Sequence, residues 1–214
     1  MPSDFTTHDL GDGHPFLTGT LPADLVWDAT KFEQVWVLHP AERHVIHMPG
    51  GPVQTPRWQQ AYGADYHYTG RTNTALPVPP VLEPLREWVR QSIDPRLNAL
   101  LLNWYDGPGH YIGPHHDSTK DMVPDSPIVT LSFGETRVFR LTRGRGGEKE
   151  LRDFEASNGV VFVLPFATNL AWKHAVPKSA RYCGRRISVT LRAFTSGGVD
   201  EVVEEIAQNH STTC

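Results

Sequence analysis

The fold is decided by seven short runs in the second half of the sequence: ALLLNWY (99–105), PIVTLSFG (127–134), TRVFRLTR (136–143), KELRDFEA (149–156), GVVFVLP (159–165), TNLAWKH (168–174) and RISVTLRAF (186–194). These runs are rich in β-branched and aromatic residues, and turn residues separate them at intervals of roughly ten. Intervals this short leave no room for helical crossovers. We therefore expect antiparallel strands that form a barrel or sandwich.

The first half of the chain has a weaker pattern. Residues 80–93 (PVLEPLREWVRQSI) carry apolar side chains at helical spacing and predict one helix. Residues 16–50 predict a short helix followed by strands, and residues 51–80 an extended loop. We divide the single domain into a flexible N-terminus (1–15), an N-terminal extension (16–97), a β-rich core (98–195) and a C-terminal tail (196–214).

The composition of the chain narrows the class of protein. The 214 residues carry a formal net charge of −4, which does not suggest a nucleic-acid binder by overall charge, although a local basic groove stays possible. The two cysteines cannot form a disulfide framework and suggest a reducing compartment. No secretory signal or membrane-spanning run is present in the sequence, so we expect a cytoplasmic or nuclear protein. We also expect a monomer.

One short motif predicts a metal site. His115 and Asp117 lie two residues apart in GPHHDST, so an extended backbone directs both side chains to one face and His116 to the other. His174, in a strand-like segment, is the candidate third ligand. Two histidines and one carboxylate suit the non-haem Fe(II) oxygenases. A chance H-x-D among eleven histidines is the alternative, and a zinc hydrolase fits less well because no H-E-x-x-H is present.

A second motif predicts an anion site. Arg186 and Arg192 lie six residues apart on one predicted strand and so share a face with Ser188 and Thr190. Burying two guanidinium groups is costly without anions, and a dicarboxylate would satisfy both. A solvated strand face is the alternative for this motif alone. Beside a metal triad, however, such a clamp is what a 2-oxoacid co-substrate requires.

Taken together, the residues from about 56 to 194 resemble the AlkB family of Fe(II)- and 2-oxoglutarate-dependent dioxygenases. The motifs appear in the family's order: PRWQQAYGADYHYTG (56–70), NWY (103–105), H-x-D (115–117), SPIVTLSFGETRVFRL (126–141), His174 with VPK (176–178), and R-x-S-V-T-L-R (186–192). The last motif departs from the family's R-x-N-x-T-F-R at Ser188 and Leu191.

The resemblance implies a mainly β fold with flanking helices, a double-stranded β-helix (jelly-roll), with iron at its open end. It implies that the core at 98–195 is catalytic and that the extension at 16–97 contains a substrate lid similar to a nucleotide-recognition lid. It implies that His115, Asp117 and His174 bind Fe(II), with O₂ and 2-oxoglutarate as co-substrates. It also implies that the distal carboxylate of 2-oxoglutarate binds Asn103, Tyr105 and Arg186, and that the carboxylate beside the keto group binds Arg192, with help near Ser188. The chemistry would release succinate and CO₂ and hydroxylate a C–H bond.

For the substrate, the resemblance implies an N-alkylated base in DNA or RNA, flipped into the site. Candidate contacts for this substrate are Arg57, which would touch a phosphate, and Tyr62, Tyr66, Tyr68, Ser118 and Thr119. The stretch from Arg137 to Arg152 is basic and either follows a nucleic-acid backbone or is simply solvated.

Two alternatives to this function stay open. Many DNA-repair members carry an acidic residue just after the H-x-D, where this chain has Ser118 and Thr119. That departure weakens the case for a cationic methylated base and leaves a protein, lipid or small-molecule substrate open. The other alternative is a binding module that keeps the barrel without the chemistry, against which the complete set of motifs argues.

Overall fold

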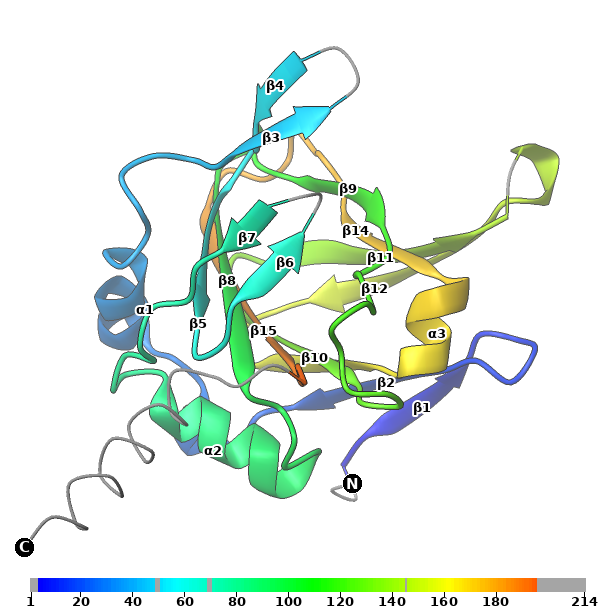
Figure 1. Ribbon diagram of the computed structural model, residues 1–214, viewed down its shortest axis with the longest axis horizontal. Coiled ribbons are helices and arrows are strands. Elements are labelled where there is room, and N and C mark those ends of the chain that lie inside the picture. Colours follow the sequence, from blue (N-terminus) through cyan, green and yellow to red (C-terminus); the bar gives the residue numbers. More distant parts are fainter. Residues whose placement is uncertain (1–3, 49–50, 69–70, 145, 196–214) are drawn as a thin grey trace, which may run out of the picture.

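Two antiparallel sheets form the centre of the computed structural model, which describes residues 4–48, 51–68, 71–144 and 146–195 (Figure 1). The larger sheet contains, in spatial order, β1 (Thr6–Asp9), β2 (Pro15–Thr20), β13 (Val160–Leu164), β10 (Ile128–Gly134), β15 (Arg185–Arg192), β8 (Ala99–Asp106) and β5 (Trp58–Tyr62). The smaller sheet contains β12 (Glu150–Ala156), β11 (Arg137–Arg143), β14 (Lys173–Val176) and β9 (Ile112–His115). This architecture confirms the predicted mainly β, jelly-roll class.

Short helices and hairpins surround the two sheets. They are the 3₁₀ turns η1 (Ala23–Leu25) and η2 (Gly146–Glu148), the helices α1 (Ala29–Trp36), α2 (Glu83–Ser92) and α3 (Phe166–Ala171), and the hairpins of β3 (Val45–Met48) with β4 (Gly51–Gln54) and β6 (Tyr66–Tyr68) with β7 (Arg71–Asn73). The predicted helix at 80–93 is α2, which starts with Pro84 in its first turn, where the missing N–H costs nothing. None of the described helices is long and apolar enough to cross a membrane.

The central strands of the larger sheet are buried on both faces. On β8, the side chains of Leu100, Leu102 and Trp104 join a core that includes α1 and α2. The Trp104 indole donates a hydrogen bond to the carbonyl of Val35, 3.1 Å away, at the end of α1. The alternate residues of β8 and β15 face the smaller sheet, where they line a pocket. Burial on both faces explains why these strands read as nearly continuous apolar runs.

A second core lies between the two sheets. Phe16 on β2 and Phe162 on β13 stack with Phe139 on β11, with ring centroids 5.8 and 4.7 Å from Phe139. Trp172, which follows α3, is fully buried in the same cluster. This aromatic cluster fixes the smaller sheet on the larger one and thereby sets the distance between the groups that each sheet carries into the pocket.

Three sequence-based expectations for the fold are wrong. Residues 6–9 lie within the segment expected to be flexible, but they form β1, paired with β2 along its whole length. The expected loop at 51–80 contains β5, which pairs with β8 and belongs to the larger sheet. The predicted strand at 168–174 begins as helix α3 and becomes the strand β14 only at Lys173. The tail at 196–214 lies outside the described residues.

Gly134, at the end of β10, gives a direct test of the fold. Its φ is +85°, and a Cβ there would lie 2.5 Å from the carbonyl oxygen of Arg185. We expect Gly134→Ala to lower the free energy of unfolding by about 2 kcal/mol or more, from left-handed strain and steric overlap. Urea denaturation measures the loss. Gly109→Ala is the matched control, because a Cβ there has no neighbour within 4 Å; equal stability of the two variants would contradict this geometry.

Candidate metal centre

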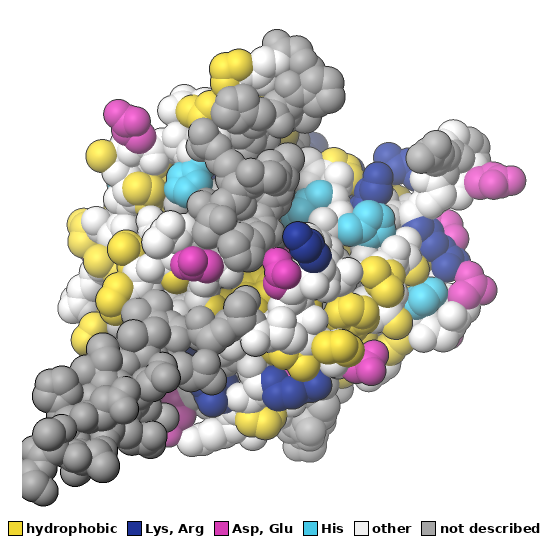
Figure 2. Space-filling view, viewed as in Figure 1, with side chains coloured by type: hydrophobic (Ala, Val, Ile, Leu, Met, Phe, Trp, Pro, Cys, Tyr) yellow, Lys and Arg dark blue, Asp and Glu magenta, His cyan; other side chains and the backbone are white. Residues whose placement is uncertain are grey.

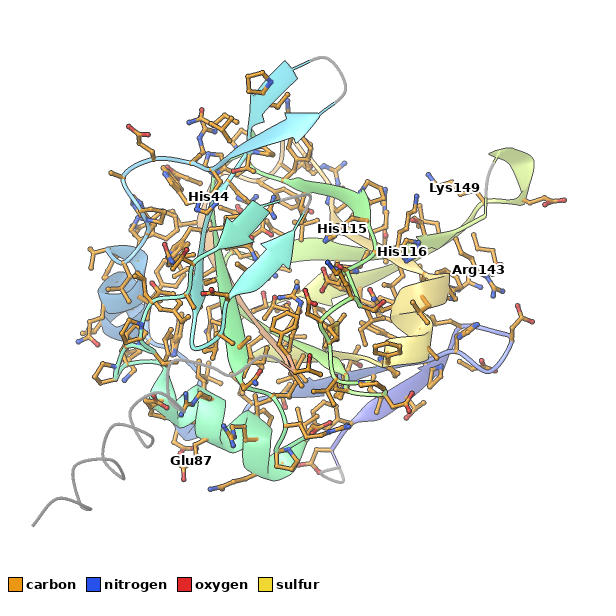
Figure 3. All side chains as sticks on the ribbon, viewed as in Figure 1. His44, Glu87, His115, His116, Arg143 and Lys149 are labelled. Atoms are coloured by element: carbon orange, nitrogen blue, oxygen red, sulfur yellow. The ribbon has the colours of Figure 1, made fainter. Side chains whose placement is uncertain are left out.

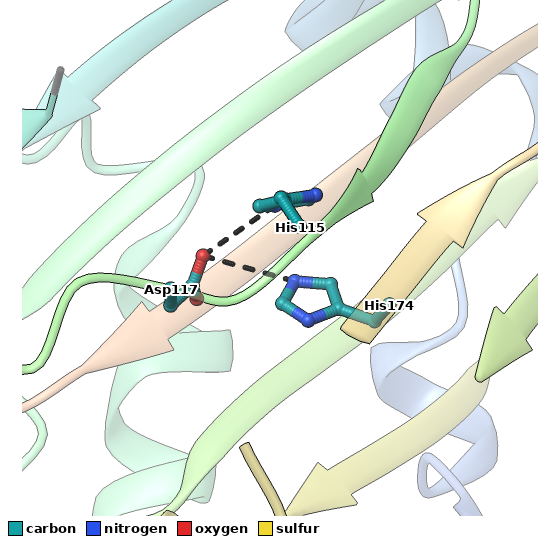
Figure 4. Close-up of side chains that lie close together, drawn as sticks. All are labelled: His115, Asp117 and His174. Atoms are coloured by element: carbon teal, nitrogen blue, oxygen red, sulfur yellow. Dashed lines mark ion pairs between the residues drawn. The ribbon is translucent and has the colours of Figure 1, made fainter. Parts of the chain in front are cut away.

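Three potential metal ligands meet where the two sheets converge. His115 ends β9, His174 lies opposite it on β14, and Asp117 follows two residues after His115 (Figure 4). The Nε2 atoms of His115 and His174 lie 3.6 and 3.7 Å from Oδ1 of Asp117. All three ligand atoms lie within 4.8 Å of one another, which suits a single ion. The structure therefore assembles the predicted triad from two strands and a loop.

The protonation state of both imidazoles suits metal binding. His115 Nδ1 lies 2.9 Å from the carbonyl oxygen of Gly113, a contact that places the proton on Nδ1 and leaves the Nε2 lone pair toward Asp117. Burial, reinforced by the neighbouring His115, lowers the pKa of His174 to about 3. His174 is therefore neutral across the physiological range and available as a ligand.

Asp117 is ionised in a buried position. Burial raises its pKa, but the charge of Arg192 and the two histidines outweigh burial and hold the pKa well below the ordinary value. Arg192 donates from Nε to Oδ2 of Asp117 at 2.7 Å, and its Nη2 forms an ion pair with the same oxygen at 2.6 Å. Oδ1 is buried without a hydrogen-bond partner. An orphaned carboxylate oxygen facing two imidazole nitrogens fits a divalent cation, and two histidines with one carboxylate favour Fe(II).

The loop that carries Asp117 is held by a residue that the sequence did not reveal. Asn169, on α3 and fully buried, accepts a hydrogen bond from the Asp117 N–H and donates one to the Asp117 carbonyl, both at 3.0 Å. The backbone carbonyl of Asn169 also contacts Nδ1 of His116. His115 and His116 lie side by side in Figure 3, at the end of β9. As predicted, His116 stays outside the triad.

Arg186 provides the strongest anion site in the pocket. Its side chain is fully buried on β15, and its Nε donates to Oγ of Ser132, 3.0 Å away. Both terminal nitrogens, Nη1 and Nη2, are buried without a partner. Its guanidinium carbon lies 5.1 Å from the ring centroid of Tyr105. Burial lowers the pKa of Arg186, and a carboxylate that bound both nitrogens would supply the missing partners.

Polar side chains continue this site across the larger sheet. Asn103 on β8 lies opposite Ser188 on β15 and opposite Gln59 on β5. Arg57, just before β5, donates from Nε to Oδ1 of Asn103 at 2.7 Å and from Nη2 to Oε1 of Gln59 at 3.2 Å. All four line the same pocket as the triad. Arg57 is only 5% exposed, and its contact with a phosphate stays a prediction.

The other predicted substrate contacts have different surroundings. Tyr62 is buried in the hydrophobic core beside α2 rather than in the pocket, and burial raises its pKa to about 12. Tyr66 and Tyr68 belong to β6, but their side chains lie outside the described part of the structure. Ser118 is exposed and Thr119 half-buried, directly after the triad residue Asp117.

The basic stretch from Arg137 to Arg152 is largely neutralised by acidic neighbours. Arg137 is buried against Glu135, and Arg140 pairs with Asp153 at 2.6 Å across the β11–β12 hairpin. Arg143 contacts both Glu150 and Asp12. Figure 2 shows basic and acidic side chains next to one another over this hairpin. Among the described residues, Arg137 is buried rather than solvated, and the pairing of Arg140 and Arg143 with acids argues against a nucleic-acid track.

The jelly-roll fold, the triad and the arginine-lined pocket together define an iron- and 2-oxoglutarate-dependent dioxygenase. A model of the 2OG-Fe(II) oxygenase superfamily matches residues 26–192. The chain therefore belongs to this superfamily, and within it to the AlkB homologue family. Its cofactor is Fe(II) and its co-substrate is 2-oxoglutarate.

Individual relatives support the family at moderate identity. DNA oxidative demethylase ALKBH2 of Arabidopsis thaliana is 30% identical over 217 residues, covering 87% of this chain and 68% of the relative. ALKBH2 of Mus musculus is 32% identical over 146 residues, covering 64% and 61%. Alpha-ketoglutarate-dependent dioxygenase alkB homolog 3 of Rattus norvegicus is 29% identical over 147 residues, covering 64% and 50%. The matches thus span half to three fifths of these two mammalian proteins.

A solved structure shares the fold. The structure of OsALKBH1 superimposes with a TM-score of 0.53 at 15% sequence identity, covering 88% of this chain and all of that one. At this identity the likeness concerns the arrangement of strands and not the substrate.

The two hydrogen bonds by which Asn169 holds the backbone of Asp117 can be tested by metal binding. We expect Asn169→Ala to lower affinity for Co(II), used as a spectroscopic substitute for Fe(II), by about 10- to 100-fold, because the loop carrying Asp117 loses both hydrogen bonds. Titration followed by the visible absorption of Co(II) gives the affinity. Leu170→Ala is the control, since this neighbour on α3 is 58% exposed. Unchanged affinity in Asn169→Ala would show that the loop is held by other contacts.

Proposed function

We propose that this dioxygenase removes N-alkyl groups from bases in DNA or RNA by oxidation. The observation that carries the proposal is the single pocket in which the triad and the two unpartnered terminal nitrogens of Arg186 lie together. Relatives covering much of the chain are named DNA oxidative demethylases, which supports an alkylated nucleic acid as substrate.

The co-substrate roles follow from the pocket. Arg186 would bind the distal carboxylate of 2-oxoglutarate through Nη1 and Nη2, with Tyr105 opposite it on β8 and Asn103 two residues away. Ser132 fixes the Arg186 side chain through Nε, and the Ser132 hydroxyl donates in turn to the carbonyl of Ala156, 3.0 Å away. The guanidinium plane is thereby oriented before the co-substrate arrives.

Arg192 has two roles in this proposal. It would bind the carboxylate beside the keto group, with help near Ser188 on the same face of β15. The structure adds a contact that the sequence did not predict, the ion pair of Arg192 with Oδ2 of Asp117. Occupying Oδ2 leaves Oδ1 as the oxygen for the metal and keeps Asp117 ionised.

When bound, Fe(II) and 2-oxoglutarate supply O₂-dependent oxidation of a C–H bond, with release of succinate and CO₂. For an N-methyl substrate, hydroxylation of the carbon gives a hemiaminal that breaks its C–N bond, releasing formaldehyde and the free N–H. The protein's contribution is to place the alkyl carbon beside the metal and to exclude water. His115 and His174, on the paired strands β9 and β14, would hold the metal in a fixed position.

Arg186 provides a test of the co-substrate assignment. We expect Arg186→Ala to raise the KM for 2-oxoglutarate by roughly 100-fold, from the loss of a charge-assisted pair of hydrogen bonds. Succinate formation against 2-oxoglutarate concentration measures this. Arg185→Ala is the matched control, because Arg185 pairs with Glu33 outside the pocket. If Arg186→Ala changed only the affinity for the alkylated substrate, the assignment of Arg186 would be wrong.

The substrate class can be tested with a panel of N-methylated oligonucleotides. Protein loaded anaerobically with Fe(II) is given 2-oxoglutarate and O₂, and succinate and formaldehyde are both measured. We expect the two products to rise together, in equal amounts, only with methylated oligonucleotides, and Asp117→Ala protein gives the background. Slow succinate formation that no oligonucleotide stimulates would refute the nucleic-acid substrate and point to a protein or a small molecule.

A further inference from the structure

Three arginines and one acid line the pocket, among the residues that the structure describes. The guanidinium groups belong to Arg57, Arg186 and Arg192, and the acid is Asp117. Arg192 is neutralised by Asp117 through a hydrogen bond and an ion pair with Oδ2. The pocket therefore contains two further positive charges that no described lining carboxylate compensates.

Arg57 is bound inside the protein by neutral groups rather than by an acid. Its two hydrogen bonds go to the amide oxygens of Asn103 and Gln59, which are neutral acceptors. No described carboxylate lies within ion-pair distance of it. At 5% exposure, water screens this charge weakly, so its field extends into the pocket.

The bound cofactors do not remove this excess. Fe(II) carries two positive charges and 2-oxoglutarate carries two negative ones, so the pair adds no net charge. Arg192 and Asp117 cancel in the same way. The loaded pocket keeps a net charge of two positive units from Arg57 and Arg186. The residues directly after the triad, Ser118 and Thr119, are neutral and supply no acid near the metal.

On the basis of the proposed function, we propose that the site selects neutral N-alkylated bases over cationic ones, and that Arg57 sets this selectivity. Alkylation at N3 of cytosine or N1 of adenine gives a cation. Alkylation at N3 of uracil or thymine, or at N1 of guanine, gives a neutral base. A cation entering a positively charged, weakly screened pocket is repelled, whereas neutral bases present carbonyl oxygens that accept hydrogen bonds from a guanidinium group.

The experiment compares two oligonucleotides that differ at one exocyclic group. One contains 3-methyluracil, which is neutral, and the other contains 3-methylcytosine, which is a cation at neutral pH. Formaldehyde release gives kcat/KM for each. Equilibrium binding to the Mn(II)-loaded protein with 2-oxoglutarate, without O₂, gives a second measurement that does not depend on turnover. Both are repeated at higher pH, where 3-methylcytosine loses its proton.

We expect a preference for 3-methyluracil on the order of tenfold at neutral pH, the size that one unit charge at about 10 Å gives at an effective dielectric constant of about 20. The preference should become smaller at the higher pH, where 3-methylcytosine becomes neutral. Any effect of titrating the protein itself cancels in the ratio of the two kcat/KM values. In Arg57→Gln, which keeps a hydrogen-bond donor without the charge, the preference should fall several-fold. Arg152→Gln, which removes an exposed arginine on β12, should leave it unchanged.

Each opposite result has a distinct meaning. Equal or faster demethylation of 3-methylcytosine by the unmodified protein would overturn the charge selectivity and leave the nucleic-acid demethylase intact. A preference that persists undiminished in folded Arg57→Gln would overturn the role of Arg57. If that variant does not fold, the pH dependence of the unmodified protein decides the charge selectivity. Succinate formation stimulated by neither oligonucleotide, nor by any other in the panel, would refute the proposed function and the selectivity with it.

Discussion

The rest of this site depends on one constraint, the burial of a polar strand face between two sheets. Every second residue of β15 points toward the smaller sheet, and the four that do so are Arg186, Ser188, Thr190 and Arg192. The other face is aliphatic and belongs to the core with α1 and α2. Period-two alternation therefore forces two guanidinium groups into the interior, where each needs an anionic or polar partner.

The two guanidinium groups of β15 do not have equivalent partners. Arg192 is satisfied within the protein by Asp117, whereas Arg186 has only Ser132 and the face of Tyr105. β15 therefore has one end, at Arg192, beside the metal ligands. At its other end, Arg186 has terminal nitrogens available to bind an anion. Asp117 serves both the arginine and the metal site, because Oδ2 compensates the charge of Arg192 and Oδ1 faces the two histidines. A dicarboxylate that chelates metal is the ligand whose chemistry matches both ends.

The sequence predicted what local periodicity determines. Most of the strands from β8 to β15, the H-x-D pair and the shared face of Arg186 and Arg192 follow from patterns within a few residues. The run at 168–174 is the exception, because it begins as helix α3. Residues 6–9 (TTHD) lack an apolar alternation, and β1 forms only because β2 lies beside it. The partners of Arg57 and Asn169 lie 46 and 52 residues away, so no local pattern could reveal their roles. The ion pairs of the β11–β12 hairpin likewise became visible only with the strand register.

The ion pairs of the β11–β12 hairpin also bear on which part of the protein can recognise a substrate. The arginines of the hairpin are committed to Asp153, Glu150 and Asp12, and the chain as a whole is acidic. Exposed paired charges contribute little, and salt screens them further. A charge inside the pocket acts through a medium that screens it far less. If the substrate is the proposed nucleic acid, Arg57 would affect a base in the site more than several paired surface arginines would affect a backbone. In our proposal, discrimination between substrates is therefore made at the base and not along the nucleic-acid chain.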